Sequence, residues 1–96
     1  MNTAIIQAIR ERKLLDLRYG GYSRTVEPHA YGRDKDGDEV VRCFQVSGGS
    51  ESGERVGWKL LKAREVFSLT QLETEFTARP EYKRGDKAIV YVFEQL

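Results

Sequence analysis

Hydrophobic positions along the chain change their spacing after the first dozen residues. Isoleucines and an alanine recur at helical spacing within residues 3–13, which predicts one short amphipathic helix with Asn2 or Thr3 as its N-cap. From residue 15 onward, hydrophobic and polar residues mostly alternate, as they do in strands with one buried face. The predicted strands cover residues 15–19, 23–31, 39–47, 55–62, 66–72 and 88–93.

Turn-forming residues separate these strands and predict how they connect. Gly20 and Gly21 predict a tight turn, and the stretches 33–38 and 48–53 predict a polar turn and a flexible loop. Pro28 has no N–H to donate, so its strand should lie at a sheet edge or bend at this residue. Residues 73–87 look irregular. One helix and five or six short strands predict a mainly β fold, a small, strongly bent sheet or barrel.

Length, charge and cysteine content narrow the class of protein. The 96 residues, of which 40% are hydrophobic, suit a single domain over residues 1–96. The net charge of +1 gives no overall attraction to nucleic acid, so anion binding requires a local patch. The single Cys43 favours a reducing compartment. The N-terminus does not read as a secretory signal, and residues 88–93 are too short to span a bilayer, so we expect a cytoplasmic protein that does not interact with membranes.

The residues that usually carry catalysis are scarce. His29 is the only histidine and Cys43 the only cysteine, which leaves no pair for hydrolase, protease or zinc chemistry. Asp34, Asp36 and Asp38 superficially resemble a calcium loop, but their glycine is misplaced for an EF-hand, and a solvated turn is the better interpretation. We therefore expect no enzyme activity, no metal and no cofactor.

Basic residues gather in the second half of the chain. The segment from Arg55 to Arg64 contains four cations and no acid, while Arg42 and Arg24 lie on earlier predicted strands. A cationic run of this kind indicates an anion-binding surface when side chains from several strands converge. The alternative is an ordinary solvated strand face, balanced by Glu27, Glu54 and Glu65.

The predicted pairing of two strands bears on the choice between an anion-binding surface and a solvated strand face. If residues 39–47 and 55–62 form a hairpin, Arg42 should lie opposite or diagonal to Lys59. Like charges at that separation repel unless an anion neutralises them, which favours a phosphate or carboxylate ligand. Trp58 lies among these cations and is a candidate to stack on a base, although a core position is the stronger interpretation for it and for Phe44. The Gly- and Ser-rich residues 47–53 are better explained as a hairpin loop than as a phosphate loop.

Several short motifs, taken in order, resemble the WYL domain family. The most specific is Arg24-Thr25-Val26-Glu27-Pro28, and the resemblance covers residues 4–86. The Trp-Tyr-Leu tripeptide of the family is absent. Where the family has an acidic residue followed by a basic one, this chain has the basic Arg64 followed by the acidic Glu65. The other matching segments are Ala8-Ile9, Leu15 to Tyr19, Tyr31-Gly32, Val41 to Val46, Gly57 to Val66, Phe76 and Pro80-Glu81-Tyr82.

The resemblance implies an Sm-like or SH3-like small β-barrel fronted by a helix. It also implies a sensor or accessory module of bacterial or phage regulators that binds nucleic acid or nucleotide-like ligands through basic residues. Together with the cationic run, this predicts a non-enzymatic regulatory module for an anionic, nucleotide- or phosphate-bearing partner. The expected contacts are Arg24, Arg42, Lys59 and Lys62, with Trp58 or Tyr31 against the flat part of the ligand.

A second hypothesis is a protein-interaction module. Small barrels expose sheet edges, so the strand that contains Pro28, or the one near Val90, would accept a strand from a regulatory protein or from a second copy of the chain. The near-zero net charge favours this alternative over bulk nucleic-acid binding.

Overall fold

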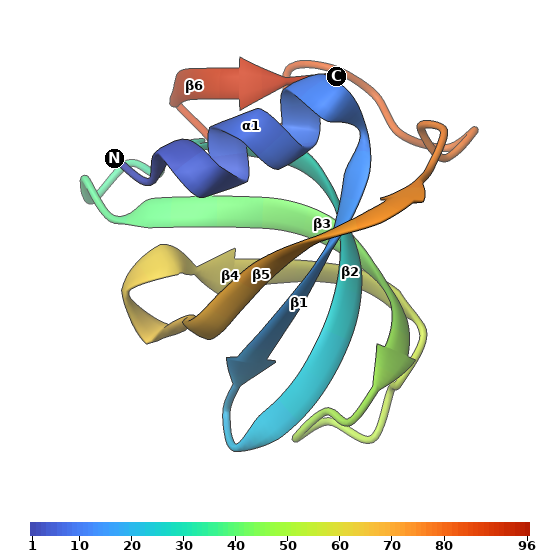
Figure 1. Cartoon of the computed structure of the whole chain (residues 1–96). Helices are drawn as coiled ribbons and strands as arrows, with labels where there is room; N and C mark the ends of the chain where they lie inside the picture. The colour runs from blue at the N-terminus through green and yellow to red at the C-terminus, as the bar shows by residue number, and fades with distance from the viewer.

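The computed structural model describes residues 1–96 and contains one α-helix and six strands (Figure 1). The expected element order is confirmed, with different ends: the helix stops before residue 13, and the last strand begins three residues later than expected. No helix is long and apolar enough to cross a membrane. The elements are α1 (Thr3–Glu11), β1 (Lys13–Tyr19), β2 (Tyr22–Arg33), β3 (Glu39–Gly48), β4 (Gly57–Lys62), the 3₁₀ turn η1 (Ala63–Glu65), β5 (Phe67–Glu75) and β6 (Tyr91–Gln95).

The six strands form one antiparallel sheet in the order β4-β3-β2-β1-β5, with β6 added to β2. The molecule measures 28 × 26 × 25 Å, and these nearly equal dimensions show that the sheet is strongly curved and not flat. The edge strands β4 and β5 do not pair with each other. The mainly β class is confirmed, but the sheet is not closed, so the expected barrel is not.

β2 is the central strand, and Pro28 marks the point where one of its edges changes partner. On that edge β2 pairs with β1 as far as Val26 and with β6 from Ala30 onward. Pro28 lies in the gap between these two partners, while on the other edge of β2 it still pairs with Cys43 of β3. The β2–β3 register also shifts between Pro28 and Ala30. Of the two expectations for Pro28, the bend is therefore correct and the edge position is wrong.

The concave face of the sheet carries the main core, with α1 packed against it. Asn2 caps the helix by accepting hydrogen bonds from the N–H groups of Ala4 and Ile5 at 2.9 and 3.2 Å. Burial of the hydrophobic side chains between α1 and the sheet is the main contribution to folding. The core residues are Ile5, Ala8, Ile9, Leu15, Leu17, Val26, Tyr31, Val41, Cys43 and Leu61.

The convex face of the central strands is covered by residues 76–90, which we call the strap. The strap connects β5 to β6 and contains no strand or helix. Its Ile89 joins Ala30 and Val40 in a second, smaller hydrophobic cluster. Most of β2 is therefore buried on both faces, because the core lies on one side and the strap on the other.

Candidate functional site

The β3–β4 hairpin sorts the predicted cations onto two faces. In the observed register Arg42 pairs with Leu60, and Lys59 pairs with Cys43. Since neighbouring residues of a strand point to opposite faces, Arg42 is on the convex face and Lys59 on the concave face. The expectation that Arg42 lies opposite or diagonal to Lys59 is therefore wrong.

Arg42 and Trp58 do meet, beneath the strap. They line a small pocket of about 170 Å³ together with four strap residues, Glu81, Tyr82, Lys83 and Asp86. The guanidinium of Arg42 donates to Asp86 at 2.6 and 3.4 Å, and this contact holds the pKa of Asp86 below its usual value. Trp58 donates its indole N–H to Glu81 at 3.2 Å. Each predicted contact residue in this pocket already has an acidic partner from the strap.

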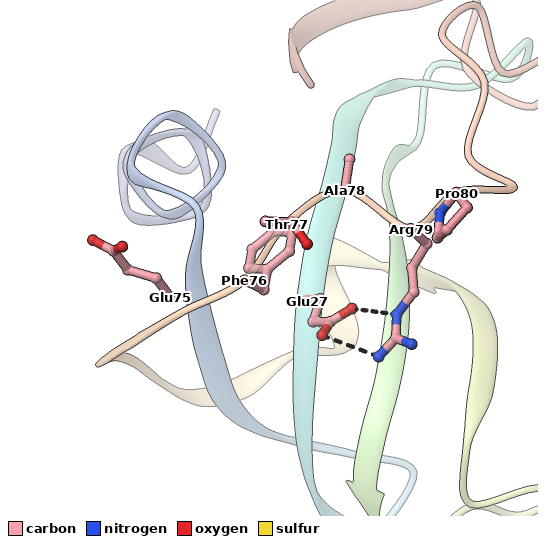
Figure 2. A pocket seen from close by; sticks show the side chains of 7 residues that line it. All are labelled: Glu27, Glu75, Phe76, Thr77, Ala78, Arg79 and Pro80. Atoms are coloured by element: carbon pink, nitrogen blue, oxygen red, sulfur yellow. Dashed lines mark hydrogen bonds and ion pairs between the residues drawn. The ribbon is translucent and has the colours of Figure 1, made fainter.

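The aromatic rings beside Trp58 form a packed cluster on the convex face. Trp58 meets His29 and Phe44 edge-on, with ring centroids 4.8 and 5.4 Å apart. Arg79 lies over the Phe44 ring at 3.8 Å. Its guanidinium also donates twice to Glu27, at 2.8 and 3.1 Å (Figure 2). The core-type interpretation of Trp58 and Phe44 is thus the better description, although they pack under the strap rather than in the main core.

Lys62 and Tyr31, two further predicted contact residues, lie outside the pocket and the aromatic cluster beneath the strap. Lys62 pairs with Asp38 at 3.6 Å, and Arg64 shares the same carboxylate at 3.2 Å. Tyr31 is 0% exposed, and its hydroxyl donates to Glu39 and accepts from the Asn2 N–H at 2.7 Å. Burial, with the bond to Glu39, raises the pKa of Tyr31 to about 12. Tyr31 therefore has no surface to offer a ligand, and the expectation that it packs against one is corrected.

Arg24 and Lys59 occupy one end of the concave face, under the loop that joins β3 to β4. Gln45 links Arg24 to this loop: its side-chain oxygen accepts from Arg24 at 3.4 Å, and its amide group donates to the Gly49 carbonyl at 2.9 Å. Lys59 donates to the Glu54 carbonyl at 2.7 Å and to the Ser50 hydroxyl at 3.2 Å. We call Arg24, Gln45, Lys59 and the covering loop 49–56 the loop-end site.

Arg24 is buried without an opposite charge. The residue is 5% exposed and forms no ion pair. Its guanidinium donates to the Tyr19 carbonyl at 3.1 and 2.9 Å and lies 5.2 and 5.9 Å from the Tyr19 and Tyr22 ring centroids. Glu27, the other charged residue that is buried, is 8% exposed and has Arg79 as its partner. The loop-end site therefore retains a positive charge that only neutral acceptors solvate.

Lys59 adds to this excess, since it forms no ion pair either. One acid lies close by: the Glu51 carboxylate rests over Gly20, on the side where Arg24 also approaches, without pairing with it. An anion that enters the loop-end site would supply the missing opposite charge, and it would compete there with Glu51.

Sequence reasoning missed Gln45, Tyr22 and the strap residues. A signal existed for Gln45, because it shares strand parity with the buried Val41 and Cys43, and a polar residue at a core position requires a partner. No local pattern identifies the strap acids, since their partners lie far away in the chain. Cys43 is 0% exposed and its pKa is raised to about 12 by burial. No group of His, Cys, Asp and Glu residues is arranged to hold a metal ion.

Comparisons with known proteins add nothing to this geometry. No family model matches the chain, and no curated protein or solved structure matches it either. The function is therefore argued from the residues of the loop-end site.

Proposed function

We propose that this chain is a non-enzymatic binding module that recognises an anionic, phosphate-bearing partner at the loop-end site. The observation that carries the proposal is the buried guanidinium of Arg24, which has no ion pair. A buried charge without an opposite charge is costly, and a bound anion would remove most of that cost. Lys59, on another strand, offers a second positive charge to the same anion.

The chemistry of the site favours phosphate in a nucleotide or in single-stranded nucleic acid. A guanidinium has five N–H groups, and Arg24 uses one on each of its three nitrogens, so two N–H groups stay free for oxygen atoms. Tyr22 packs against Gly49 beside Arg24 and is 42% exposed, so its ring offers a flat surface on which a base can stack. Tyr22 takes the role that the sequence suggested for Tyr31 or Trp58.

Access requires movement of the covering loop. Lys59 now donates to two loop groups, the Glu54 carbonyl and the Ser50 hydroxyl. Phosphate oxygens are stronger acceptors for an ammonium group than either of these. Gly53 lies in this loop with a φ of +82° and has open space around it, so the loop has room to rearrange.

The test is a titration with a fluorescent thymidine octanucleotide and with pyrophosphate. Lys59→Ala should weaken binding of both probes about tenfold, or about 1.4 kcal/mol. Lys62→Ala is the matched control, because Lys62 lies on the same strand but pairs with Asp38 at 3.6 Å. Equal losses in the two variants, or no binding of either probe, would contradict the proposal.

A second variant separates Arg24 from general charge effects. Glu51→Gln removes the acid that competes for the loop-end site and should tighten binding of both probes. Glu73→Gln makes the same change of charge on β5, outside the loop-end site, and should leave affinity unchanged. A gain of the same size in both variants would show that net charge, and not this site, governs binding.

We also propose that the chain is related to the WYL family and that its sheet is an open version of an Sm-like or SH3-like barrel. The Arg-Thr-Val-Glu-Pro motif supports this, because each of its three distinctive residues has a defined role. Arg24 supplies the buried charge, Glu27 binds Arg79, and Pro28 lies where β2 changes partner. A regulatory role and a cytoplasmic location belong to the same proposal, the latter supported by the single buried thiol of Cys43.

A homodimer or protein-interaction module is the second candidate function. β2 is not an edge, so the version of this hypothesis that used the Pro28 strand is wrong. The observation that favours it is β5, an edge strand whose Phe67 is 65% exposed. Val90, just before β6, is exposed as well. Light scattering over a range of concentrations tests the homodimer, and Phe67→Lys should abolish any dimer that forms through β5.

A further inference from the structure

The strap is fixed to the convex face mainly by side chains. Arg79 binds Glu27, Glu81 accepts from Trp58, and Asp86 accepts from Arg42 at 2.6 Å. Figure 2 shows the first of these contacts, with Arg79 reaching from the strap back to Glu27 on β2. The strap thus covers an aromatic and cationic surface made of Phe44, Trp58 and Arg42.

Hydrogen bonds that join main-chain atoms of the strap to main-chain atoms of the rest of the fold occur only at its two ends. The Phe76 N–H donates to the Arg12 carbonyl at 2.9 Å, and the Val90 N–H donates to the Arg33 carbonyl at 2.8 Å. Between these residues the remaining main-chain bonds stay inside the strap, from Tyr82 to Arg79 and from Ile89 to Asp86. The middle of the strap can therefore lift away while β5 and β6 keep their places.

His29 holds this middle part from below. Its Nε2 accepts the Arg79 main-chain N–H at 3.1 Å, and its Nδ1 lies 2.8 Å from the Glu27 carbonyl. A carbonyl oxygen only accepts, so Nδ1 carries the hydrogen and Nε2 offers a lone pair. A second proton on the ring would remove that lone pair and set two N–H groups against each other. The closed strap thus requires neutral His29.

We propose that residues 76–90 are a proton-sensitive cover, which His29 releases when it takes up a proton, exposing Phe44, Trp58 and Arg42. The proposal does not depend on the loop-end site, because none of these residues belongs to it. Its physical basis is the use of both ring nitrogens in a buried position, where a neutral imidazole fits and an imidazolium does not.

The charges around His29 set the direction of the effect. Glu27 from β2 and Glu81 from the strap favour the proton, whereas Arg79 from the strap opposes it; Tyr82 adds a neutral ring and β4 the ring of Trp58. Burial outweighs the acids, so the pKa of His29 in the closed form is below 6.5. The open form therefore binds more protons, and lowering the pH below about 6.5 favours opening, by up to about tenfold per pH unit.

The only tryptophan of the chain reports directly on this opening, because Trp58 lies against the only histidine. Quenching of Trp58 fluorescence by acrylamide should increase severalfold between about pH 7.5 and about pH 5, in line with an open form favoured by acid. His29→Gln is the control: its amide oxygen can accept from the Arg79 N–H and does not titrate. This variant should show the low quenching of the wild type at neutral pH throughout the range.

Amide hydrogen exchange of the wild-type chain gives an independent check. After correction for intrinsic rates, strap amides near Arg79 and Tyr82 should lose protection at the lower pH, while the amides of β2 and β3 keep it. Three outcomes would overturn the proposal: quenching that does not change with pH, a His29→Gln variant that changes as the wild type does, or loss of protection across the whole sheet together with the strap.

Discussion

Two buried charged residues, three positions apart on β2, are treated differently by this fold. Glu27 accepts two hydrogen bonds from Arg79, whereas Arg24 donates only to carbonyl and amide oxygens and forms no ion pair with the nearby Glu51. If stability alone had determined these positions, both would be expected to have partners or to be hydrophobic. The proposed binding role of Arg24 accounts for this contrast, and Glu27 holds the strap through Arg79.

Replacing each of these residues should separate the two roles. Arg24→Met keeps the volume but removes the unmatched charge, so we expect the free energy of unfolding to change by less than about 1 kcal/mol, or to rise. Glu27→Gln leaves Arg79 without its carboxylate and should cost about 1–3 kcal/mol. Urea denaturation measures both changes. A large loss in Arg24→Met alone would show that Arg24 is a structural residue.

Cys43 should be inert until the chain unfolds. Its thiol is fully buried and its pKa is raised to about 12, so almost no thiolate exists at neutral pH. We expect a disulfide reagent such as Ellman's reagent to react with the native chain only as fast as the chain opens, and at once in denaturant. Rapid reaction of the native protein at pH 8 would contradict the burial of this side chain.

At the scale of elements, strand positions and the two hairpins β1–β2 and β3–β4 followed from the sequence, but the partners of strands far apart in the chain did not. Alternation located the strands because each has one face on the core, as with Leu15 and Leu17 in β1. Alternation carries no information about which edge meets which strand, and so the sequence could not show that β2 changes partner at Pro28. The strap looked irregular for a related reason: its anchors, Arg79 and Asp86, bind residues distant in the chain.

Gly32 is an element-level position that should tolerate substitution poorly. A Cβ atom at Gly32 would lie 2.1 Å from the Tyr91 carbonyl oxygen and 2.6 Å from Ile89, so β6 and the strap would have to shift. We expect Gly32→Ala to lower the free energy of unfolding by at least about 1–3 kcal/mol, the usual cost of overpacking. Gly49→Ala is a useful comparison, because its Cβ would meet the exposed Tyr22 ring, which can move aside. A smaller loss for Gly32→Ala than for Gly49→Ala would contradict this packing argument.

At the scale of the whole molecule, charge pairing explains why the predicted cationic cluster was only partly correct. Composition showed basic residues on several strands, yet Arg42, Lys62 and Arg64 each meet an aspartate in the fold. Those aspartates come from the β2–β3 turn and from the strap, and sequence alone does not place either beside β3 or β4. Among the predicted cations, Arg24, Lys59 and the exposed Arg55 form no ion pair, and Arg24 and Lys59 lie on the face opposite to Arg42.

Such pairing limits the salt dependence of binding. With two cations in contact with phosphates, the slope of log K against log salt for a single strand should be about −0.7 per contact, or about −1.4 in all. Titrations of the thymidine octanucleotide between about 50 and 200 mM salt measure this slope. A much steeper slope would mean that paired cations such as Arg42 also reach the strand, as they would if the strap were open. The same titration with Lys59→Ala should reduce the slope by about half.

The double use of one edge of β2 also affects how the chain reaches its native state. Because β6 follows β5 and the strap in the chain, a nascent chain made only as far as β5 would carry Ala30 to Gly32 with their backbone groups unpaired on that side and the convex aromatic rings bare. β1 and β6 share one edge of β2, so this edge is not fully paired until residues 91–95 have been made. Deletion of residues 91–95 should therefore yield an aggregation-prone product rather than a slightly destabilised one.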